Sequence, residues 1–202
     1  MAEPYHLTLP PVAATAAPPA VDALYERSRQ ASRMVPNMYT FMANAPGLLE
    51  TYMDGYNRFR AESGFSAIEQ EVVFLAISRE HECAYCLAAH SLVADVMSKV
   101  PRAVTDAIRD DATVPDERLA VLASFVRHLV STRGRPEDDQ ARAFLAAGFT
   151  ERQILYLILS IAVKTISNYT NHLCETPVDA AFKVREWGVY RAAQAVVEAA
   201  RR

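Results

Sequence analysis

Two helix-start signals, each followed by a long apolar segment, restrict this chain to a helical fold. Ser66 stands three residues before Glu69, and Thr150 stands three residues before Gln153, which is the capping-box arrangement. After each signal, apolar residues recur every three or four positions: Ile68, Val72, Leu75 and Ala76, then Ile154, Leu155, Ile158, Leu159, Ile161, Ala162 and Ile166. No segment alternates with period two for long enough to form a strand. The sequence therefore predicts an all-α protein.

Further helices are expected from the same periodicity. The segments 21–34, 48–62, 83–97 and 185–200 all have helical spacing of apolar residues. Asp116 can cap a helix that carries Leu119, Leu122, Ala123, Val126 and Leu129. Gly148 suits the end of a short helix over 137–147. These elements predict a multi-helix bundle.

The first 19 residues differ from the rest, because Pro4, Pro10, Pro11, Pro18 and Pro19 prevent helix formation there. We expect an arm over 1–19 that wraps over the body or over a neighbouring subunit, or else a disordered tail. The rest of a 202-residue chain suits one domain, over 20–202.

Charge and composition exclude several function classes. The chain has 21 basic and 24 acidic residues, so it lacks the basic surplus that nucleic acids or anionic membranes attract. The longest apolar run, 154–163, is shorter than the roughly 18 residues of a membrane span. The first residues do not resemble a signal peptide, and three cysteines are too few for a disulfide framework. We therefore expect a cytoplasmic protein with no nucleic-acid or membrane partner.

One segment carries chemistry: Cys83 and Cys86 are three residues apart, and His90 follows four residues later. On a helix, these three side chains lie on one face. Two sulfurs at this spacing can form a disulfide, and a histidine can accept the proton of a thiol. A thiolate that attacks a peroxide becomes a sulfenic acid, which a second thiol converts to a disulfide. This set can therefore run an oxidative half-reaction without a metal or an organic cofactor.

Simpler interpretations of these residues exist. A buried cysteine is often an inert small apolar residue, and a histidine can be an ordinary core residue. Alternatively, Cys83, Cys86 and His90 could bind structural zinc together with His172 or Cys174. Zinc sites usually hold such a cysteine pair in a turn and add a second close pair of ligands, whereas this pair is expected on a helix. We therefore favour the redox interpretation, with no metal.

The motif resembles the signature of the alkylhydroperoxidase D family, in the carboxymuconolactone decarboxylase superfamily. Glu71 precedes Cys83 by 12 positions, which gives the pattern Glu-x11-Cys-x2-Cys-x3-His. Val35-Pro36-Asn37, Pro46 and the segment 164–172 also resemble its peroxidase-related branch, so that the resemblance covers about residues 21–185. It implies an all-α fold with a helical-hairpin core, and oligomers that are commonly trimers or hexamers.

The resemblance also implies roles for single residues. Cys86 would attack the peroxide, Cys83 would resolve the sulfenic acid, and Glu71 and His90 would relay protons. Tyr85 departs from the pattern, because alkylhydroperoxidase D proper has a histidine at this point. A phenol can donate or accept a hydrogen bond but cannot serve as a base near neutral pH.

Three further positions are interpreted from their surroundings. Glu71 shares a helix face with Ile68 and Leu75, so its carboxylate needs a partner, for which the His–Cys pair is the candidate. The segment 168–172, which includes Asn168 and His172, either caps the end of the long apolar helix or lines the substrate entrance. Cys174 is expected to be a packing residue.

The leading hypothesis is a cofactor-free thiol peroxidase that reduces organic hydroperoxides or hydrogen peroxide. An external dithiol protein, lipoyl or thioredoxin-like, would regenerate the dithiol. The alternatives are a non-enzymatic redox sensor or disulfide-exchange module, which needs the same dithiol, and a carboxymuconolactone decarboxylase-like lyase. The superfamily name suggests the lyase, but that branch typically lacks the cysteine pair.

Overall fold

The computed structural model describes residues 3–188, 192 and 199 of the chain, which form nine α-helices, one π-helical turn and one 3-10 turn. Over this part of the chain there is no strand, so the predicted all-α class is confirmed. The helices are α1 (Pro19–Ser32), α2 (Asn37–Met42), α3 (Pro46–Glu62), α4 (Ala67–Glu80), α5 (Ala84–Val93), α6 (Arg102–Asp110), α7 (Glu117–Ser131), α8 (Asp138–Ala146) and α9 (Glu151–Cys174). The π-helical turn η1 (Ala94–Ser98) continues α5, and the 3-10 turn is η2 (Lys183–Arg185).

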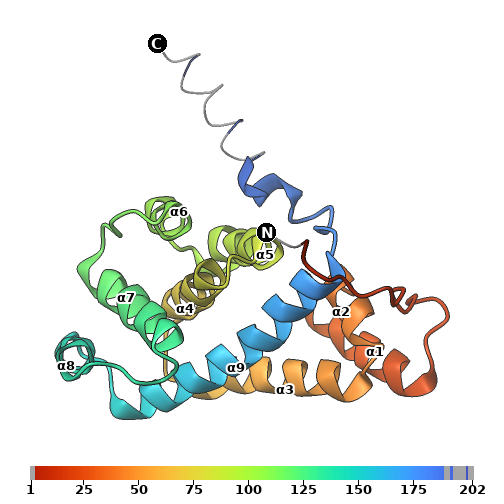
Figure 1. Ribbon diagram of the computed structural model, residues 1–202, viewed down its shortest axis with the longest axis horizontal. Coiled ribbons are helices and arrows are strands. Elements are labelled where there is room, and N and C mark those ends of the chain that lie inside the picture. Colours follow the sequence, from red (N-terminus) through yellow and green to blue (C-terminus); the bar gives the residue numbers. More distant parts are fainter. Residues whose placement is uncertain (1–2, 189–191, 193–198, 200–202) are drawn as a thin grey trace.

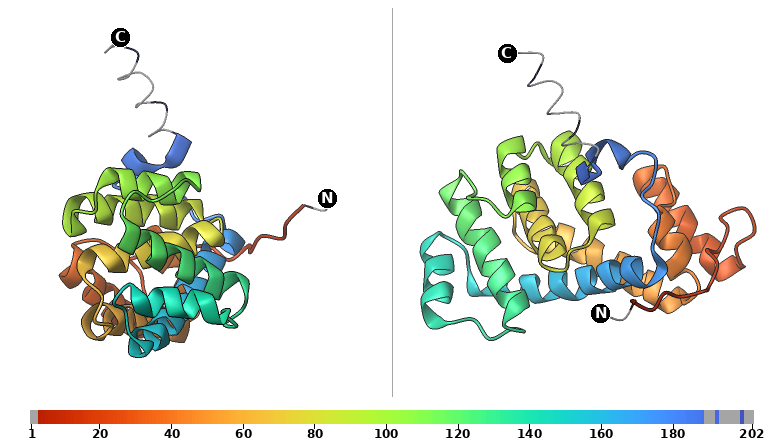
Figure 2. Two further views of the ribbon diagram at one scale, coloured as in Figure 1. Left: turned by 90° about the vertical axis from the view of Figure 1, so that its left-hand side faces the viewer. Right: turned by 45° about the horizontal axis from the view of Figure 1, so that its top comes forward.

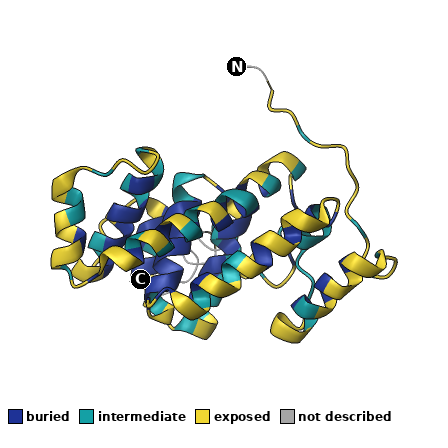
Figure 3. Cartoon of the chain, turned by 90° about the horizontal axis from the view of Figure 1, so that it is seen from below, coloured by how far each residue is buried: buried dark blue, intermediate teal, exposed yellow. Residues whose placement is uncertain are grey.

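The helices are arranged around the central pair α4 and α5, a helical hairpin (Figure 1). Helices α1 and α2 lie at one end of the molecule and α7 and α8 at the other, while α9 runs between the two ends beside α3 (Figures 1 and 2). Helix α4 contacts α5, α6, α7 and α9. Every residue of α4 from 69 to 78 is buried, and the helices at the centre of the molecule carry the buried surface (Figure 3).

The core consists of two apolar clusters that meet at α3 and α9. One cluster is built on α4 and α7 and includes Phe74, Leu122 and Phe125. The other lies among α1, α2 and α3 and includes both Cys83 and Cys86. The cysteine pair therefore lies inside the protein, at one side of the central hairpin.

The helix-start signals act as expected. The Ser66 hydroxyl accepts a hydrogen bond from the Glu69 backbone N–H, and the Glu69 carboxylate accepts one from the Ser66 N–H at 2.8 Å. Thr150 and Gln153 form the same reciprocal pair at the start of α9, and Asp116 accepts from Leu119 N at 2.9 Å. Each cap satisfies backbone donors that the first helical turn leaves free.

Two helices were not predicted from the sequence, α2 and α6. Helix α2 has six residues, which is too few turns for a periodic apolar pattern, whereas the nine residues of α6 carry Val104, Ala107 and Ile108 at helical spacing, a local signal for this helix. Each follows a proline, Pro36 or Pro101, whose fixed φ suits a helix start. The predicted helix over 185–200 lies mostly outside the described residues.

The proline-rich N-terminal segment lies along the body where it is described. Val12 N donates to Thr40 O at 2.8 Å, and the Tyr25 hydroxyl donates to Val12 O at 2.9 Å. Farther toward the N-terminus, Leu7 N donates to Leu173 O at the end of α9, at 2.7 Å. The segment therefore connects α1 and α2 with the end of α9.

In the part of the chain that the structure describes, no single helix is both long and apolar enough to cross a membrane. Helices α8 and α9 meet the length and composition criteria only together, and a bend of 111° separates them.

Candidate active site

The cysteine pair lies at the start of α5, just after a sharp turn from α4. Glu82 has a left-handed backbone with φ 54°, and Cys83 N donates to Ser78 O at 2.9 Å, which reverses the chain direction. Cys83 is the N-cap residue of α5, and Cys86 lies in its first turn. Both are free thiols, with exposed fractions of 1% and 2%. The structure therefore contains the reduced dithiol, with both sulfurs shielded from solvent.

One face of α9 contacts the cysteine pair. The Asn171 side-chain amide donates toward Cys86 Sγ at 3.3 Å and toward Cys83 Sγ at 3.8 Å, so one donor serves both sulfurs. Ser167 Oγ lies 3.8 Å from Cys86 Sγ. Lys164, one turn before Ser167, is fully buried. Because positions 164, 167 and 171 share one helix face, α9 surrounds the Cys86 sulfur with polar groups.

These surroundings separate the acidities of the two thiols. Burial raises the pKa of Cys86, but the hydrogen bond from Cys83, the charge of Lys164 and the Ser167 hydroxyl outweigh burial and lower its pKa to about 6. The hydrogen bond to Cys86, together with burial, raises the pKa of Cys83 well above its usual value. At neutral pH, Cys86 is therefore the thiolate and Cys83 the thiol.

A second group of polar residues lies one helical turn after Cys86, where His90 of α5 meets α3 and α4. The Glu71 carboxylate is fully buried, accepts a hydrogen bond from His90 Nδ1 at 2.9 Å, and pairs with the Arg60 guanidinium. The partners of Glu71 are thus His90, as predicted, and Arg60 of α3, which takes the place of the predicted cysteine. Since a carboxylate can only accept, His90 carries its hydrogen on Nδ1 and leaves Nε2 free as a base.

The protonation states of this buried group are consistent. Burial raises the pKa of Glu71, but the bonds and charges of His90 and Arg60 bring its pKa below the usual value. Burial and the nearby Lys164 charge lower the pKa of His90 to about 4. At neutral pH the group is therefore a carboxylate between a guanidinium and a neutral imidazole.

No hydrogen bond joins His90 directly to Cys86 within the described residues, although both lie on α5. The His90 ring instead packs between aromatic rings, with its centroid 4.8 Å from that of Phe74 and 6.4 Å from that of Tyr56. The sequence placed His90 correctly beside Glu71. Its transfer of a proton to a cysteine sulfur stays a prediction.

Tyr85, at the position where the family has a histidine, has a structural partner. Its hydroxyl donates to Asp179 Oδ2 at 2.5 Å, and burial together with this bond raises its pKa. Asp179 also accepts from Asn37 N at 3.1 Å, at the start of α2. Through Asp179, Tyr85 therefore links the segment after α9 to α2 and α5.

The two candidate residues of the segment 168–172 differ in exposure, because Asn168 is buried and His172 is exposed. Asn168 is buried and bonds through Nδ2 to His81 Nδ1 at 3.2 Å, and it accepts from Ser167 Oγ at 3.2 Å. His172 is exposed and stacks on Tyr169, with ring centroids 6.5 Å apart, on the outer side of α9. Asn168 therefore supports a residue that contacts Cys86, whereas His172 does not reach the sulfurs.

Within the described residues, no group of three or more histidine, cysteine or acidic side chains is close enough to hold a metal ion. The alternative zinc set is therefore not brought together, and Cys174 is a half-buried free thiol at the end of α9.

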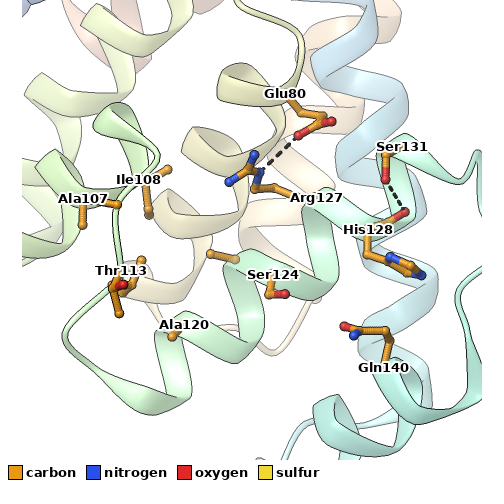
Figure 4. A pocket seen from close by; sticks show the side chains of 13 residues that line it. Glu80, Ala107, Ile108, Thr113, Ala120, Ser124, Arg127, His128, Ser131 and Gln140 are labelled. Atoms are coloured by element: carbon orange, nitrogen blue, oxygen red, sulfur yellow. Dashed lines mark hydrogen bonds and ion pairs between the residues drawn. The ribbon is translucent and has the colours of Figure 1, made fainter.

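A surface pocket of about 450 Å³ lies apart from this site, among α4, α6, α7 and α8 (Figure 4). Its arginine, Arg127, is paired with Glu80 and Asp111, and Glu137 N donates to its histidine, His128. It contains no cysteine, so the thiol chemistry belongs to the buried pair.

Five residues of the site were not predicted as site residues: Arg60, Lys164, Ser167, Asn171 and Asp179. Three of them lie on α9, more than 75 residues after Cys86, and only the family-like segment 164–172 pointed to that region. A buried lysine within an apolar helix is the one signal that could have identified Lys164 from the sequence.

In comparisons of sequence, no family model and no curated protein matches the chain. Comparison with solved structures defines its class: the chain has the AhpD-like fold. It is similar to the alkylhydroperoxidase AhpD core of an uncharacterized peroxidase-related protein from Ralstonia eutropha JMP134, with a TM-score of 0.77, 19% identity, and coverage of 92% of this chain and 98% of that chain.

Two other solved structures have the same fold. An uncharacterized peroxidase-related protein from Silicibacter sp. TM1040 has a TM-score of 0.72 and 22% identity, over 90% of this chain and 95% of that one. A cysteine-to-alanine variant of the debrominase Bmp8, in complex with 2,3,4-tribromopyrrole, has a TM-score of 0.73 and 15% identity, over 89% of this chain and 96% of that one. At these identities the likeness establishes the fold and leaves the activity open.

Proposed function

We propose that this protein is a thiol peroxidase that uses Cys86 as the nucleophile and Cys83 as the resolving thiol. The observation that carries the proposal is the pair of buried free thiols at the start of α5, where Asn171 donates to both sulfurs and Ser167 contacts Cys86. The lowered pKa of Cys86 agrees with its role as the nucleophile. A thiolate with an adjacent thiol is the arrangement that two-electron reduction of a peroxide needs.

The reaction balances without a metal. The Cys86 thiolate attacks one peroxide oxygen, the S–O bond forms as the O–O bond breaks, and the other oxygen leaves as an alkoxide or hydroxide that takes up a proton. Cys83 then attacks the sulfenic acid, the S–S bond forms, and the departing hydroxide takes the Cys83 proton to become water. The peroxide is reduced by two electrons and the dithiol is oxidised to a disulfide.

We assign Glu71 and His90 to proton transfer in the second step. Glu71 holds the hydrogen of His90 on Nδ1, so that Nε2 can take the Cys83 proton and return it to the leaving hydroxide. An external dithiol protein, lipoyl or thioredoxin-like, would then reduce the disulfide.

The experiment counts thiols on denatured protein before and after one equivalent of tert-butyl hydroperoxide. The Cys174→Ser variant is the matched control, because it keeps the site intact. We expect the loss of two thiols in both proteins and a Cys83–Cys86 disulfide in the peptide mass spectrum. Cys86→Ser should stop peroxide consumption, and Cys83→Ser should stop at a sulfenic acid that dimedone traps. An unchanged thiol count would refute the proposal.

Repeated turnover separates the enzyme from a redox sensor. With excess dihydrolipoamide or reduced thioredoxin, an enzyme consumes many equivalents of peroxide per chain, whereas a sensor consumes one. The lyase alternative predicts conversion of a carboxylated lactone by the Cys83→Ser, Cys86→Ser double variant.

A second activity, reductive debromination, is favoured by one observation beside the likeness to Bmp8. Three aromatic rings, Tyr39, Tyr52 and Tyr56, belong to the apolar cluster that contains the dithiol, with successive centroids 5.7 and 6.0 Å apart. Such rings can stack on a flat aromatic substrate. Two thiols would replace bromide by hydrogen and become a disulfide, with release of bromide and one proton. Bromide release from 2,3,4-tribromopyrrole, measured with and without Cys86→Ser, tests this activity.

A homo-oligomer, trimer or hexamer, also remains a proposal. Helix α9 exposes Leu155 and Ile158, at 67% and 53%, one turn apart on its outer face, and a second copy of the chain would cover them. We expect a light-scattering mass above that of one 22.4 kDa chain, and a lower mass for the Leu155→Glu, Ile158→Glu variant. A monomeric parent protein would exclude this interface.

A further inference from the structure

Lys164 is the least expected residue of the site. It lies in the middle of α9 with no exposed surface, and none of the ion pairs of the described residues joins its ammonium group to a carboxylate. Burial of an unpaired charge is strongly unfavourable, so such a group is retained only where something offsets its cost. The ring of Phe74 has its centroid 5.7 Å from Nζ, a cation–π contact that is worth less than the cost of burying the charge.

Lys164 shares a face of α9 with the residues that contact the Cys86 sulfur. Ser167 and Asn171, on the same face of α9, lie 3.8 Å and 3.3 Å from Cys86 Sγ. Phe74, over which the ammonium lies, also packs on His90. Lys164 is therefore close enough to both the nucleophilic sulfur and the His90 ring for its charge to lower the pKa of Cys86 and of His90.

The other ionisable groups around Cys86 cannot take its place. They are Tyr52, Tyr56 and Arg60 on α3, Glu71 on α4, His81 just after α4, Cys83, Tyr85 and His90 at α5, and Asp179 after α9. Burial and the charge of Lys164 lower the pKa of His81, and the Asp179 carboxylate is bonded to the Tyr85 hydroxyl. Arg60 is already paired with Glu71, and the tyrosines and Cys83 have raised pKa values. Lys164 is thus the cation at this site that has no carboxylate partner among the described residues.

We propose that Lys164 is the counter-ion of the Cys86 thiolate and the acid that protonates the oxygen leaving from the hydroperoxide. This assignment rests on the proposed peroxidase function. As the S–O bond forms and the O–O bond breaks, the departing alkoxide or hydroxide takes a proton from Lys164 Nζ and leaves as alcohol or water. Lys164 remains as a neutral amine and regains from solvent the proton that Cys86 lost on ionisation.

The test compares two electrophiles that differ in their leaving group. Iodoacetamide releases iodide, which needs no proton, whereas tert-butyl hydroperoxide releases an alkoxide, which does. In a Cys83→Ser, Cys174→Ser parent, Cys86 is the sole thiol. The rates of both reactions at Cys86 are followed from pH 5 to pH 10 by mass spectrometry, with dimedone trapping of the sulfenic acid.

Three lysine variants separate the two roles of Lys164. Lys164→Met removes both the positive charge and the proton that could be donated. Lys164→Arg keeps the positive charge, but the guanidinium does not release its proton between pH 5 and pH 10. Lys183→Met, at an exposed position, is the matched control and should behave like the parent. If Lys164→Met does not fold, Lys164→Gln takes its place in the same comparison.

The counter-ion role predicts slower alkylation of Lys164→Met at pH 7, by about tenfold or more, with full recovery at pH 10 where the thiolate forms unaided. The acid role predicts that peroxide reduction stays about 100-fold slow at every pH. Lys164→Arg should alkylate like the parent and reduce peroxide slowly.

Recovery of the peroxide rate at pH 10 in parallel with alkylation would overturn the acid role. Unchanged rates in Lys164→Met would overturn both roles. A parent protein that alkylates at low pH yet never reacts with peroxide would refute the proposed function, and its alkylation profile would still decide the counter-ion role.

Discussion

Replacement of Glu71 by glutamine tests the buried group formed by Arg60, Glu71 and His90. The variant keeps the shape of the side chain but removes the charge that holds Arg60 and His90. Glu71 has no exposed surface, and the Arg60 side chain is 21% exposed, so the guanidinium is left largely buried without a counter-charge. Removal of one member of a buried ion pair costs about 3 kcal/mol or more. For a chain of this size, that corresponds to a fall in melting temperature of roughly 6 to 12 °C.

The assay is thermal and urea unfolding followed by circular dichroism at pH 7. Glu62→Gln is the matched control, because Glu62 pairs with Arg58 at the surface, and we expect its unfolding free energy to change by less than about 0.5 kcal/mol. Adding Arg60→Met to Glu71→Gln should restore part of the lost stability, since the orphaned charge is then gone. Equal melting temperatures for Glu71→Gln and Glu62→Gln would refute this account, and so would strictly additive effects of the two changes at Glu71 and Arg60.

Three further predictions follow from the described contacts. Asn171→Leu removes the donor to both sulfurs and should raise the pKa of Cys86 by about one unit, and an unchanged pH profile of alkylation would contradict that role. Asp179→Ala leaves the buried Tyr85 hydroxyl without its acceptor, so urea unfolding should show a loss of about 1–3 kcal/mol, and wild-type stability would argue against this contact. The pKa of His90 is about 4 in the folded protein against a usual 6.5, so the neutral imidazole favours the folded state fully above pH 6.5, and this stability is lost as the pH falls toward 4. Urea unfolding should detect a loss of about 2 kcal/mol in unfolding free energy between pH 7 and pH 5. A loss of the same size in His90→Asn would exclude His90 as its source.

Local signals in the sequence were sufficient for most helices and for half of the site. The capping pairs Ser66–Glu69 and Thr150–Gln153 mark the starts of α4 and α9, because a cap depends only on residues three positions apart. Glu71 and His90 could be paired because each lies on the apolar face of its helix. The cysteine spacing placed both sulfurs together for the same reason.

The remaining half depends on contacts between distant parts of the chain. Arg60 lies 11 residues from Glu71, and Asn171 lies 85 residues from Cys86, so local spacing does not reveal these contacts. Only Lys164 has a local signal, because it is a charged residue within an apolar helix. The partner of Tyr85 is Asp179, 94 residues later, in a segment without helical periodicity. Helix α2 was missed for a related reason, since tertiary contacts rather than its own pattern hold its six residues in place.

The polar face of α9 also bears on which reductant the protein can use. Lys164, Ser167 and Asn171 stabilise the negative charge of the Cys86 thiolate. Because the disulfide carries no charge, these groups stabilise the reduced dithiol more than the disulfide. Stabilisation of the reduced form makes a disulfide a stronger oxidant, as the comparison among thioredoxin-like proteins illustrates. The Cys83–Cys86 disulfide should therefore accept electrons readily, even from dithiols that are only moderate reductants. Substitutions on α9 would tune this driving force while both cysteines on α5 stay unchanged.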